Sequence, residues 1–151
     1  MTFRYNPPVE RMGELTEITS RFGFRGSEFH YGLDIVPPPH DGLLRFISTG
    51  KVLREAFHPI SGNFVEYEAN YIDNRKWKIL YAHLAKRCPL GVGEKFDVGE
   101  WAGIIGETGH ATGRHVHIEM TPDWSIQRVD PEAWLENWRL IFELRKCEER
   151  R

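Results

Sequence analysis

The sequence predicts a mainly β protein, with an antiparallel sheet as its core and a single α-helix near the C-terminus. Apolar stretches of strand length alternate with turn residues, and glycine recurs densely between residues 91 and 109. Apolar spacing of three and four, typical of a helix, begins only after Asp130. No composition shift or Gly/Ser-rich linker divides the 151 residues, so one domain with one core is expected.

Five strands are expected in the first part of the chain, over residues 18–24, 33–36, 43–53, 63–69 and 75–82. The prolines at 37–39 end the second strand, because proline cannot donate to a sheet ladder. Gly50 permits a bend or bulge in the third. Asp73-Asn74 separates the last two, which predicts a hairpin and an antiparallel sheet.

The strand over residues 75–82 has a clear alternation of side chains. Trp77, Ile79 and Tyr81 occupy every second position, so they are expected to form an apolar face that ends in His83. On this pattern alone, His83 is interpreted as a histidine at the edge of the core.

Short apolar stretches at residues 96–98 and 101–105 follow, among closely spaced glycines. This glycine density suits tight turns and closely approaching backbones. A phosphate-binding loop would end in Gly-Lys-Ser or Gly-Lys-Thr, and this segment does not, so nucleotide binding is not expected.

The one expected helix covers residues 131–147. Asp130 supplies an N-cap carboxylate, Pro131 suits the first turn, and Glu132 lies where the helix dipole favours negative charge. The helix is expected to pack on the sheet of the same domain through an apolar stripe formed by Trp134, Leu135, Trp138, Ile141 and Phe142.

Charge and composition exclude several classes of partner. The net charge is −2, and the basic residues near the C-terminus alternate with acidic ones, so no nucleic-acid partner is expected. Cys88 and Cys147 are too few and too distant for a disulfide framework or a cysteine zinc site. Residues 1–15 lack an apolar core and no apolar run could span a bilayer, so neither a signal peptide nor membrane insertion is expected. We expect a monomer.

His115-Val116-His117 is the most informative short motif. On a strand, His115, His117 and Glu119 share one face, and the two imidazoles stand about 7 Å apart. One imidazole can then ligate zinc while the other reaches a water molecule or the substrate. Taken alone, the motif is more typical of two polar residues on the wet face of a half-buried strand.

Two upstream segments add metal-binding groups. His30 and Asp34 lie four residues apart, and His83 follows Tyr81-Ala82 at the end of an expected strand. Three separated segments therefore offer imidazoles and a carboxylate, which are the ligands of catalytic zinc sites.

The ordered motifs resemble those of the lysostaphin-type zinc endopeptidases, which cut peptidoglycan cross-bridges. The resemblance covers about residues 18–134, and the flanking segments 20–23 and 129–131 agree with it. It implies the lysostaphin-type fold, a partly open sandwich, with residues 1–17 as an N-terminal extension and 18–134 as the zinc endopeptidase domain. The motifs are His30-x-x-x-Asp34, Tyr81-Ala82-His83-Leu84 and Gly106-x-Thr108-Gly109-x-Ala111-Thr112-Gly113-x-His115-Val116-His117.

By this resemblance, His30, Asp34 and His117 bind zinc, while His83 and His115 are catalytic. Such a zinc site polarises a peptide carbonyl and lowers the pKa of its bound water toward about 7. We expect His115 to act as general base, and His83 to steady the oxyanion or to help protonate the leaving amine. Because a histidine base has to be neutral, activity is expected to fall as the pH drops through about 6.5.

Other polar residues near the motifs are given lesser roles. Glu119 is expected to support the site rather than to ligate the metal, and His40, His58 and His110 are expected in loops. Arg114 stands where relatives typically have proline, and residues 40–45 depart from the family pattern. These departures concern the shape of the groove and substrate preference.

The resemblance predicts a zinc-dependent endopeptidase that hydrolyses peptide cross-links or bridges of bacterial peptidoglycan. Without an expected signal peptide, it would be made in the cytoplasm as a phage or prophage lysis enzyme released through a holin, or act as a virion component during infection. The alternative is an inactive family member that binds peptidoglycan or activates another hydrolase. A thermolysin-like enzyme is disfavoured, since the sequence lacks His-Glu-x-x-His.

Overall fold

The computed structural model describes residues 17–36, 42–70, 75–123 and 125–134. All strand pairings in these segments are antiparallel, and the predicted mainly β fold class is confirmed. The strands are β1 (Glu17–Ser20), β2 (Gly23–Arg25), β3 (Glu28–His30), β4 (Leu33–Val36), β5 (Leu43–Arg45), β6 (Gly50–His58), β7 (Gly62–Asn70), β8 (Lys76–Leu84), β9 (Lys95–Phe96), β10 (Trp101–Ile104) and β11 (Val116–Pro122).

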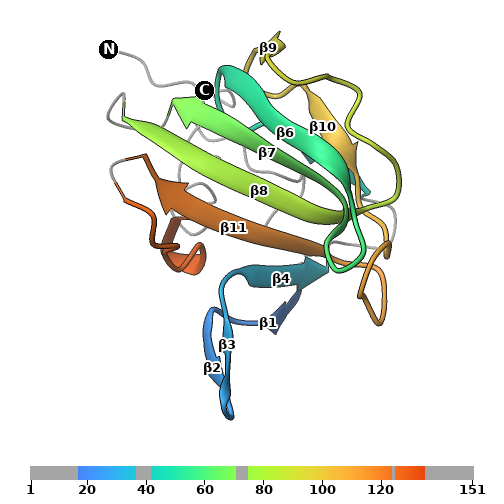
Figure 1. Cartoon of the computed structure of the whole chain (residues 1–151), viewed down its shortest axis with the longest axis vertical. Helices are drawn as coiled ribbons and strands as arrows, with labels where there is room; N and C mark the ends of the chain where they lie inside the picture. Colours follow the sequence, from blue (N-terminus) through green and yellow to red (C-terminus); the bar gives the residue numbers. More distant parts are fainter. Residues whose placement is uncertain (1–16, 37–41, 71–74, 124, 135–151) are drawn as a thin grey trace, which may run out of the picture.

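One large sheet organises the molecule (Figure 1). Its seven strands follow the order β1-β4-β11-β8-β7-β6-β9, and two smaller sheets are formed by β5 with β10 and by β2 with β3. The β2–β3 hairpin projects beyond the β1 edge of the large sheet (Figure 1). Strands β4, β11 and β8 are therefore neighbours, although they come from three distant parts of the sequence.

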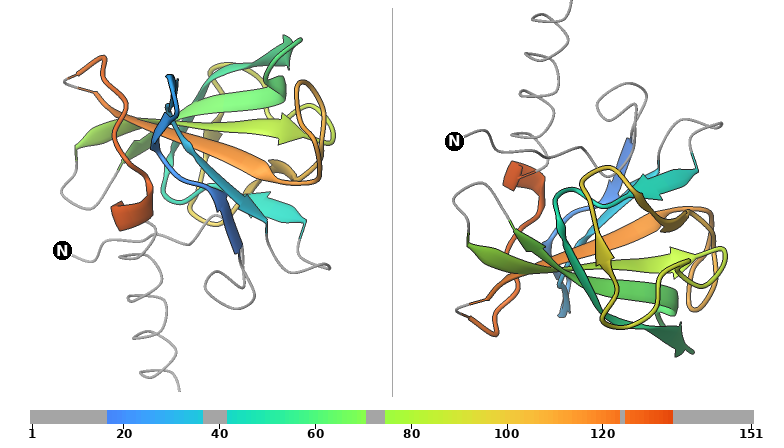
Figure 2. Two further views of the ribbon diagram at one scale, coloured as in Figure 1. Left: turned by 90° about the horizontal axis from the view of Figure 1, so that it is seen from below. Right: turned by 90° about the horizontal axis from the view of Figure 1, so that it is seen from above.

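The hydrophobic core lies on one face of the large sheet. Trp77, Ile79 and Tyr81 of β8 are buried there, as the alternation predicted, together with the apolar side chains of β11. The small β5–β10 sheet lies on this side of the large sheet (Figure 2). The Phe46 ring, just after β5, packs 4.9 Å from the Tyr67 ring, and the Tyr81 hydroxyl donates to the Arg45 carbonyl at 3.0 Å.

Two expected strands are each divided in two. Residues 18–24 form β1 and β2, because the chain leaves its pairing with β4 and enters the hairpin with β3. Residues 43–53 form β5 and the start of β6, which belong to different sheets. The prediction of one strand in each place was wrong, since a continuous apolar pattern does not reveal which sheet it joins.

The remaining predicted elements are partly described. Strands β7 and β8 pair as the predicted hairpin, but its turn at 73–74 and the prolines at 37–39 lie outside the described residues. Asp130 accepts a hydrogen bond from the Glu132 backbone at 2.9 Å, as expected for an N-cap. Residues 132–134 are helical, and the rest of the expected helix over 131–147 lies outside the described residues.

Cys88 is a buried free thiol, whereas Cys147 lies outside the described residues, as does nearly all of the expected extension over 1–17. In the described part of the chain, no helix is long and apolar enough to cross a membrane.

Candidate active site

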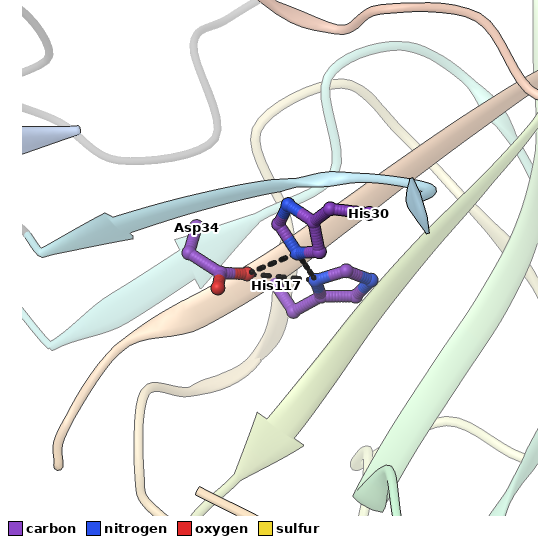
Figure 3. A group of neighbouring side chains, drawn as sticks. All are labelled: His30, Asp34 and His117. Atoms are coloured by element: carbon purple, nitrogen blue, oxygen red, sulfur yellow. Dashed lines mark hydrogen bonds and ion pairs between the residues drawn. The ribbon is translucent and has the colours of Figure 1, made fainter. Parts of the chain in front are cut away.

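Strands β3, β4 and β11 bring three potential metal ligands together. The register of β11 with β4 places His117 opposite Asp34, and His30 ends β3 beside them. His117 Nδ1 lies 2.7 Å from Asp34 Oδ1 and 3.2 Å from His30 Nε2, and His30 Nε2 lies 3.4 Å from Asp34 Oδ1 (Figure 3). One nitrogen or oxygen of each residue therefore faces a common point.

The spacing of these three atoms suits a zinc ion. Ligands at about 2.0–2.1 Å in tetrahedral directions are separated from each other by about 3.3 Å. The separations of His30 Nε2 from the other two atoms, 3.2 and 3.4 Å, match this value. His117 Nδ1 and Asp34 Oδ1 are closer because they share a hydrogen bond. Two imidazoles and one carboxylate also form a typical donor set for catalytic zinc.

Hydrogen bonds on the outer side of the two rings orient these ligand nitrogens. His30 Nδ1 donates to the Arg21 carbonyl at 2.9 Å, which leaves Nε2 with its lone pair. His117 Nε2 donates to Glu119 at 3.0 Å, and Arg128 Nε donates to the other Glu119 oxygen at 2.6 Å. Carboxylates that hold ligand histidines in this way fix both the tautomer and the orientation of the ring.

Two further residues, Tyr31 and Gly32, support the same ligands. The Arg128 guanidinium lies 5.1 Å from the centre of the Tyr31 ring, so Arg128 contacts both the segment that carries His30 and the segment that carries Glu119. A Cβ atom at Gly32 would lie 2.6 Å from Cε1 of His117. Only glycine therefore fits here without displacing the His117 ring.

The carboxylates change the ionisation of His117 in the metal-free protein. Burial lowers the pKa of His117, but the hydrogen bonds with Asp34 and Glu119 outweigh it and raise that pKa to about 9. Burial raises the pKa of Asp34, but the hydrogen bond with His117 and the charges of the surrounding histidines together outweigh burial and lower that pKa. A proton thus occupies the space between Asp34 and His117 at neutral pH, and a metal ion would have to displace it.

His83 and His115 lie in the same open cavity as the three potential ligands. The cavity has a volume of about 500 Å³ and is lined by His30, Asp34, His83, His115 and His117, together with residues of the surrounding loops. The rings of His83 and His115 are 4.8 Å apart, and His115 Nε2 lies 3.9 Å from Asp34 Oδ2. All five residues singled out from the sequence are therefore neighbours.

His83 reaches the cavity through an irregularity in β8. The pairing of β7 with β8 shifts between Asn63 and Val65, and His83 has a positive φ of 65°. The side chain consequently lines the cavity together with that of Ala82, instead of continuing the face of Tyr81. The expected position of His83 on the apolar face was wrong, because bulges redirect side chains and are not visible in an alternating pattern.

Thr108 holds His83 in this unusual conformation. Nδ1 of His83 donates to the Thr108 carbonyl at 2.8 Å, while the Thr108 hydroxyl donates to the Leu84 carbonyl at 2.6 Å and accepts from the Asn63 backbone at 3.0 Å. Gly62 has a φ of 65°, and a Cβ atom there would collide with Thr108. The turn between β6 and β7 thus packs directly on the residue that orients His83.

Both histidines of the second group present Nε2 to the cavity as a proton acceptor. Nδ1 of His115 donates to the Gly113 carbonyl at 2.9 Å, just as Nδ1 of His83 donates to Thr108. Because a carbonyl can only accept, Nε2 carries the lone pair in each neutral ring. Burial lowers the pKa of His83 and outweighs its hydrogen bond with Thr108, so His83 is neutral at pH 7.

The other polar residues named from the sequence have separate positions. Glu119 contacts His117 and Arg128, in agreement with a supporting role. His110 is exposed in a loop and lines the cavity, whereas His58 is the last residue of β6, so its expected place in a loop was wrong. His40 lies outside the described residues.

Sequence reasoning did not find Arg128, Thr108 or Gly32 as supporting residues. Gly32 and Thr108 carried a signal, because Gly32 lies between His30 and Asp34 in the first motif and Thr108 is a named residue of the third motif. The contacts of Arg128 and Thr108 with the site depend on chain segments that the fold brings together.

Comparison with known proteins gives a family match over the region that contains the site. Residues 28–131 match the model of peptidase family M23. An uncharacterised metalloprotease of Buchnera aphidicola subsp. Baizongia pistaciae (strain Bp) is 30% identical over 102 residues, which are 66% of this chain and 24% of that protein. The chain thus spans about a quarter of the length of this curated relative.

Solved structures show the same fold. A zinc-containing peptidase from Vibrio cholerae superposes with a TM-score of 0.67 and 27% identity, over 86% of this chain and 39% of that chain. The catalytic domain of the antimicrobial peptidase lysostaphin from Staphylococcus simulans superposes with a TM-score of 0.65 and 24% identity, over 80% of this chain and 91% of that domain. The lysostaphin comparison supports the fold.

Proposed function

The chain belongs to peptidase family M23, the lysostaphin-type metallopeptidases, and we propose that it is a zinc-dependent endopeptidase that hydrolyses peptide cross-links or bridges of bacterial peptidoglycan. The observation that carries this proposal is the convergence of three potential ligand atoms and two further histidines in one cavity. A metal site with nearby proton acceptors is the arrangement that metal-assisted peptide hydrolysis needs.

His30, Asp34 and His117 are the proposed zinc ligands, through Nε2, Oδ1 and Nδ1 respectively. Zinc, when bound, supplies positive charge that polarises the substrate carbonyl and acidifies a water molecule. The backbone carbonyl of Arg21 and the carboxylate of Glu119 accept hydrogen bonds from the outer nitrogens of His30 and His117, so that the inner nitrogens remain available to the metal.

His115 is the proposed general base. Its Nδ1 is held by the Gly113 carbonyl, so Nε2 is free to take a proton from the attacking water. The imidazolium that results lies 3.9 Å from Asp34 Oδ2, and this negative charge stabilises it.

His83 is the proposed second proton-handling group. In its neutral form Nε2 accepts, so His83 can steady an oxyanion or protonate the leaving amine only after it has gained a proton, either from solvent in the open cavity or, through the neighbouring His115, from the attacking water. Its lowered pKa means that this proton is then released readily, which suits delivery to the amine nitrogen.

The test is the clearing of purified peptidoglycan from one Gram-positive and one Gram-negative source. The zinc-loaded protein is compared with chelator-treated protein, with chelator-treated protein after zinc add-back, and with a His115→Ala control. The proposal requires chelator-sensitive clearing that releases free amines without new reducing sugar. If neither wall is cleared although zinc is bound, the result would favour a family member that binds peptidoglycan or activates another hydrolase, or one that acts on an untested wall chemistry. Action as a phage or prophage lysis or infection enzyme remains a prediction from the sequence.

A further inference from the structure

A second, smaller pocket adjoins the metal-site cavity. Its volume is about 160 Å³, and its lining includes Lys78 and Leu80 of β8, Thr121 of β11 and Ile126. Glu119 lines both this pocket and the metal-site cavity. The two hollows therefore adjoin at Glu119, along β8 and β11.

Most charges in this second pocket are neutralised by a partner. Arg54 makes two hydrogen bonds with Glu66, of 3.2 and 3.3 Å. Arg128 donates to Glu119 at 2.6 Å. These two pairs leave Lys78 as the remaining charged residue of the pocket lining.

The Lys78 ammonium has no ion-pair partner within residues 17–36, 42–70, 75–123 and 125–134. Glu68 lies opposite Lys78 in the pairing of β7 with β8, but its carboxylate contacts Lys76 at 3.5 Å. No acidic side chain of the described residues lies within ion-pair distance of the Lys78 ammonium, although Asp123 lines a neighbouring hollow together with Lys78. An anionic group would complement this ammonium.

The register gives the distance of this charge from the metal site. Ala82 pairs with His117 and Lys78 pairs with Thr121, so Lys78 lies four residues along the strands from the ligand His117. Four residues of strand span about 13 Å. An extended peptide covers the same distance with about four residues.

We propose that Lys78 binds a carboxylate of the substrate about four residues from the bond that is cut. A lysine ammonium offers three donors and a compact charge, and an uncharged oligoglycine has no group to match it. The preferred substrate is therefore a carboxylate-bearing stem peptide or cross-link, and not a glycine bridge. This inference rests on the proposed endopeptidase function and names its substrate class.

The experiment compares one peptidoglycan preparation before and after carbodiimide-mediated amidation of its carboxyl groups. Wild-type protein, Lys78→Met and Lys76→Met are assayed for the rate of amine release against peptidoglycan concentration. Lys76→Met is the matched control, since Lys76 lies two residues away on the same strand and already contacts Glu68. Amidation is expected to raise the half-saturating concentration about fivefold for the wild type and for Lys76→Met. For Lys78→Met, the half-saturating concentration is expected to be about fivefold higher already on unmodified peptidoglycan and not to change on amidation. Its maximal rate is expected to be unaltered.

Two results would overturn the proposal. One is an equal response of wild type and Lys78→Met to amidation, and the other is no response by the wild type. Failure of the endopeptidase function is distinguishable, because the wild type would then release no amine from either preparation. In that case, binding is measured instead. The zinc-loaded wild type, Lys78→Met and Lys76→Met are each co-sedimented with the unmodified and the amidated peptidoglycan.

Discussion

Two groups of residues in the cavity are held in place by different means. The ligand group, His30, Asp34 and His117, is fixed by the pairing of β4 with β11 and by the carboxylate of Glu119. The histidine pair, His83 and His115, is oriented by backbone carbonyls of the 108–113 segment. The first arrangement depends on sheet register and charge, and the second on a loop and a bulge. Metal binding and proton transfer should therefore be separable by mutation.

The largest expected effect comes from removing one member of each group. His117→Ala should lose zinc because one of three ligands is gone, whereas His115→Ala should retain zinc and lose about 100- to 10,000-fold in turnover. Zinc content by atomic absorption and peptidoglycan cleavage measure the two effects separately. Full zinc occupancy in His117→Ala, or full activity in His115→Ala, would contradict these roles.

A test of packing behind the ligand group is Gly32→Ala. The added methyl group would overlap the His117 ring, so zinc affinity should fall by up to about 100-fold, the upper range for overpacking. Competition with a chromophoric chelator measures the affinity. Gly113→Ala is the control, because a Cβ atom at Gly113 meets no atom within 4 Å. Equal affinities in the two variants would mean that the close contact does not constrain the ligand.

A smaller effect is expected from the support of His117. Glu119→Gln and Arg128→Met should each weaken zinc binding by about tenfold, because the His117 ring loses its fixed tautomer or orientation. Arg54→Met is the matched control, since it breaks an Arg–Glu pair on the same sheet that does not touch a ligand. If Arg54→Met lost as much zinc affinity as Arg128→Met, the loss would reflect a general effect of surface charge.

An opposite pH dependence of stability is expected for the two groups in the metal-free protein. The pKa of His117 is raised to about 9, so its contribution to stability is complete below pH 6.5 and is lost as the pH rises through about 9. The pKa of His83 is lowered, so its contribution is present above pH 6.5 and is lost as the pH falls below that value.

Denaturant unfolding at pH 5.5, 7 and 9 measures this difference for wild type, His117→Gln and His83→Gln. The deficit of His117→Gln should shrink toward pH 9, and that of His83→Gln should shrink toward pH 5.5. The same trend in both variants would show that the two histidines do not have opposite shifts.

The sequence predicted the regular parts of this molecule well. Alternation in residues 75–82 identified the buried side of β8, and the motifs singled out five residues that lie together in the cavity. The orientation of His83 could not be read in the same way, because the bulge arises from pairing with β7. Thr108 and Arg128 act through contacts 25 and nine residues away along the chain, which no local pattern contains.

Only one side of the large sheet is buried, and this determines whether a substrate must enter the site by a free end or can enter from the side. The β5–β10 layer covers one side, and the described strands leave Lys78, Leu80 and Thr121 partly accessible on the other. A tunnel would accept only a free chain end that could be threaded into it. If the proposed function holds, the open side of β8 and β11 would receive a segment from the side, so that a peptide tethered at both ends within a polymer mesh could reach the ligand group.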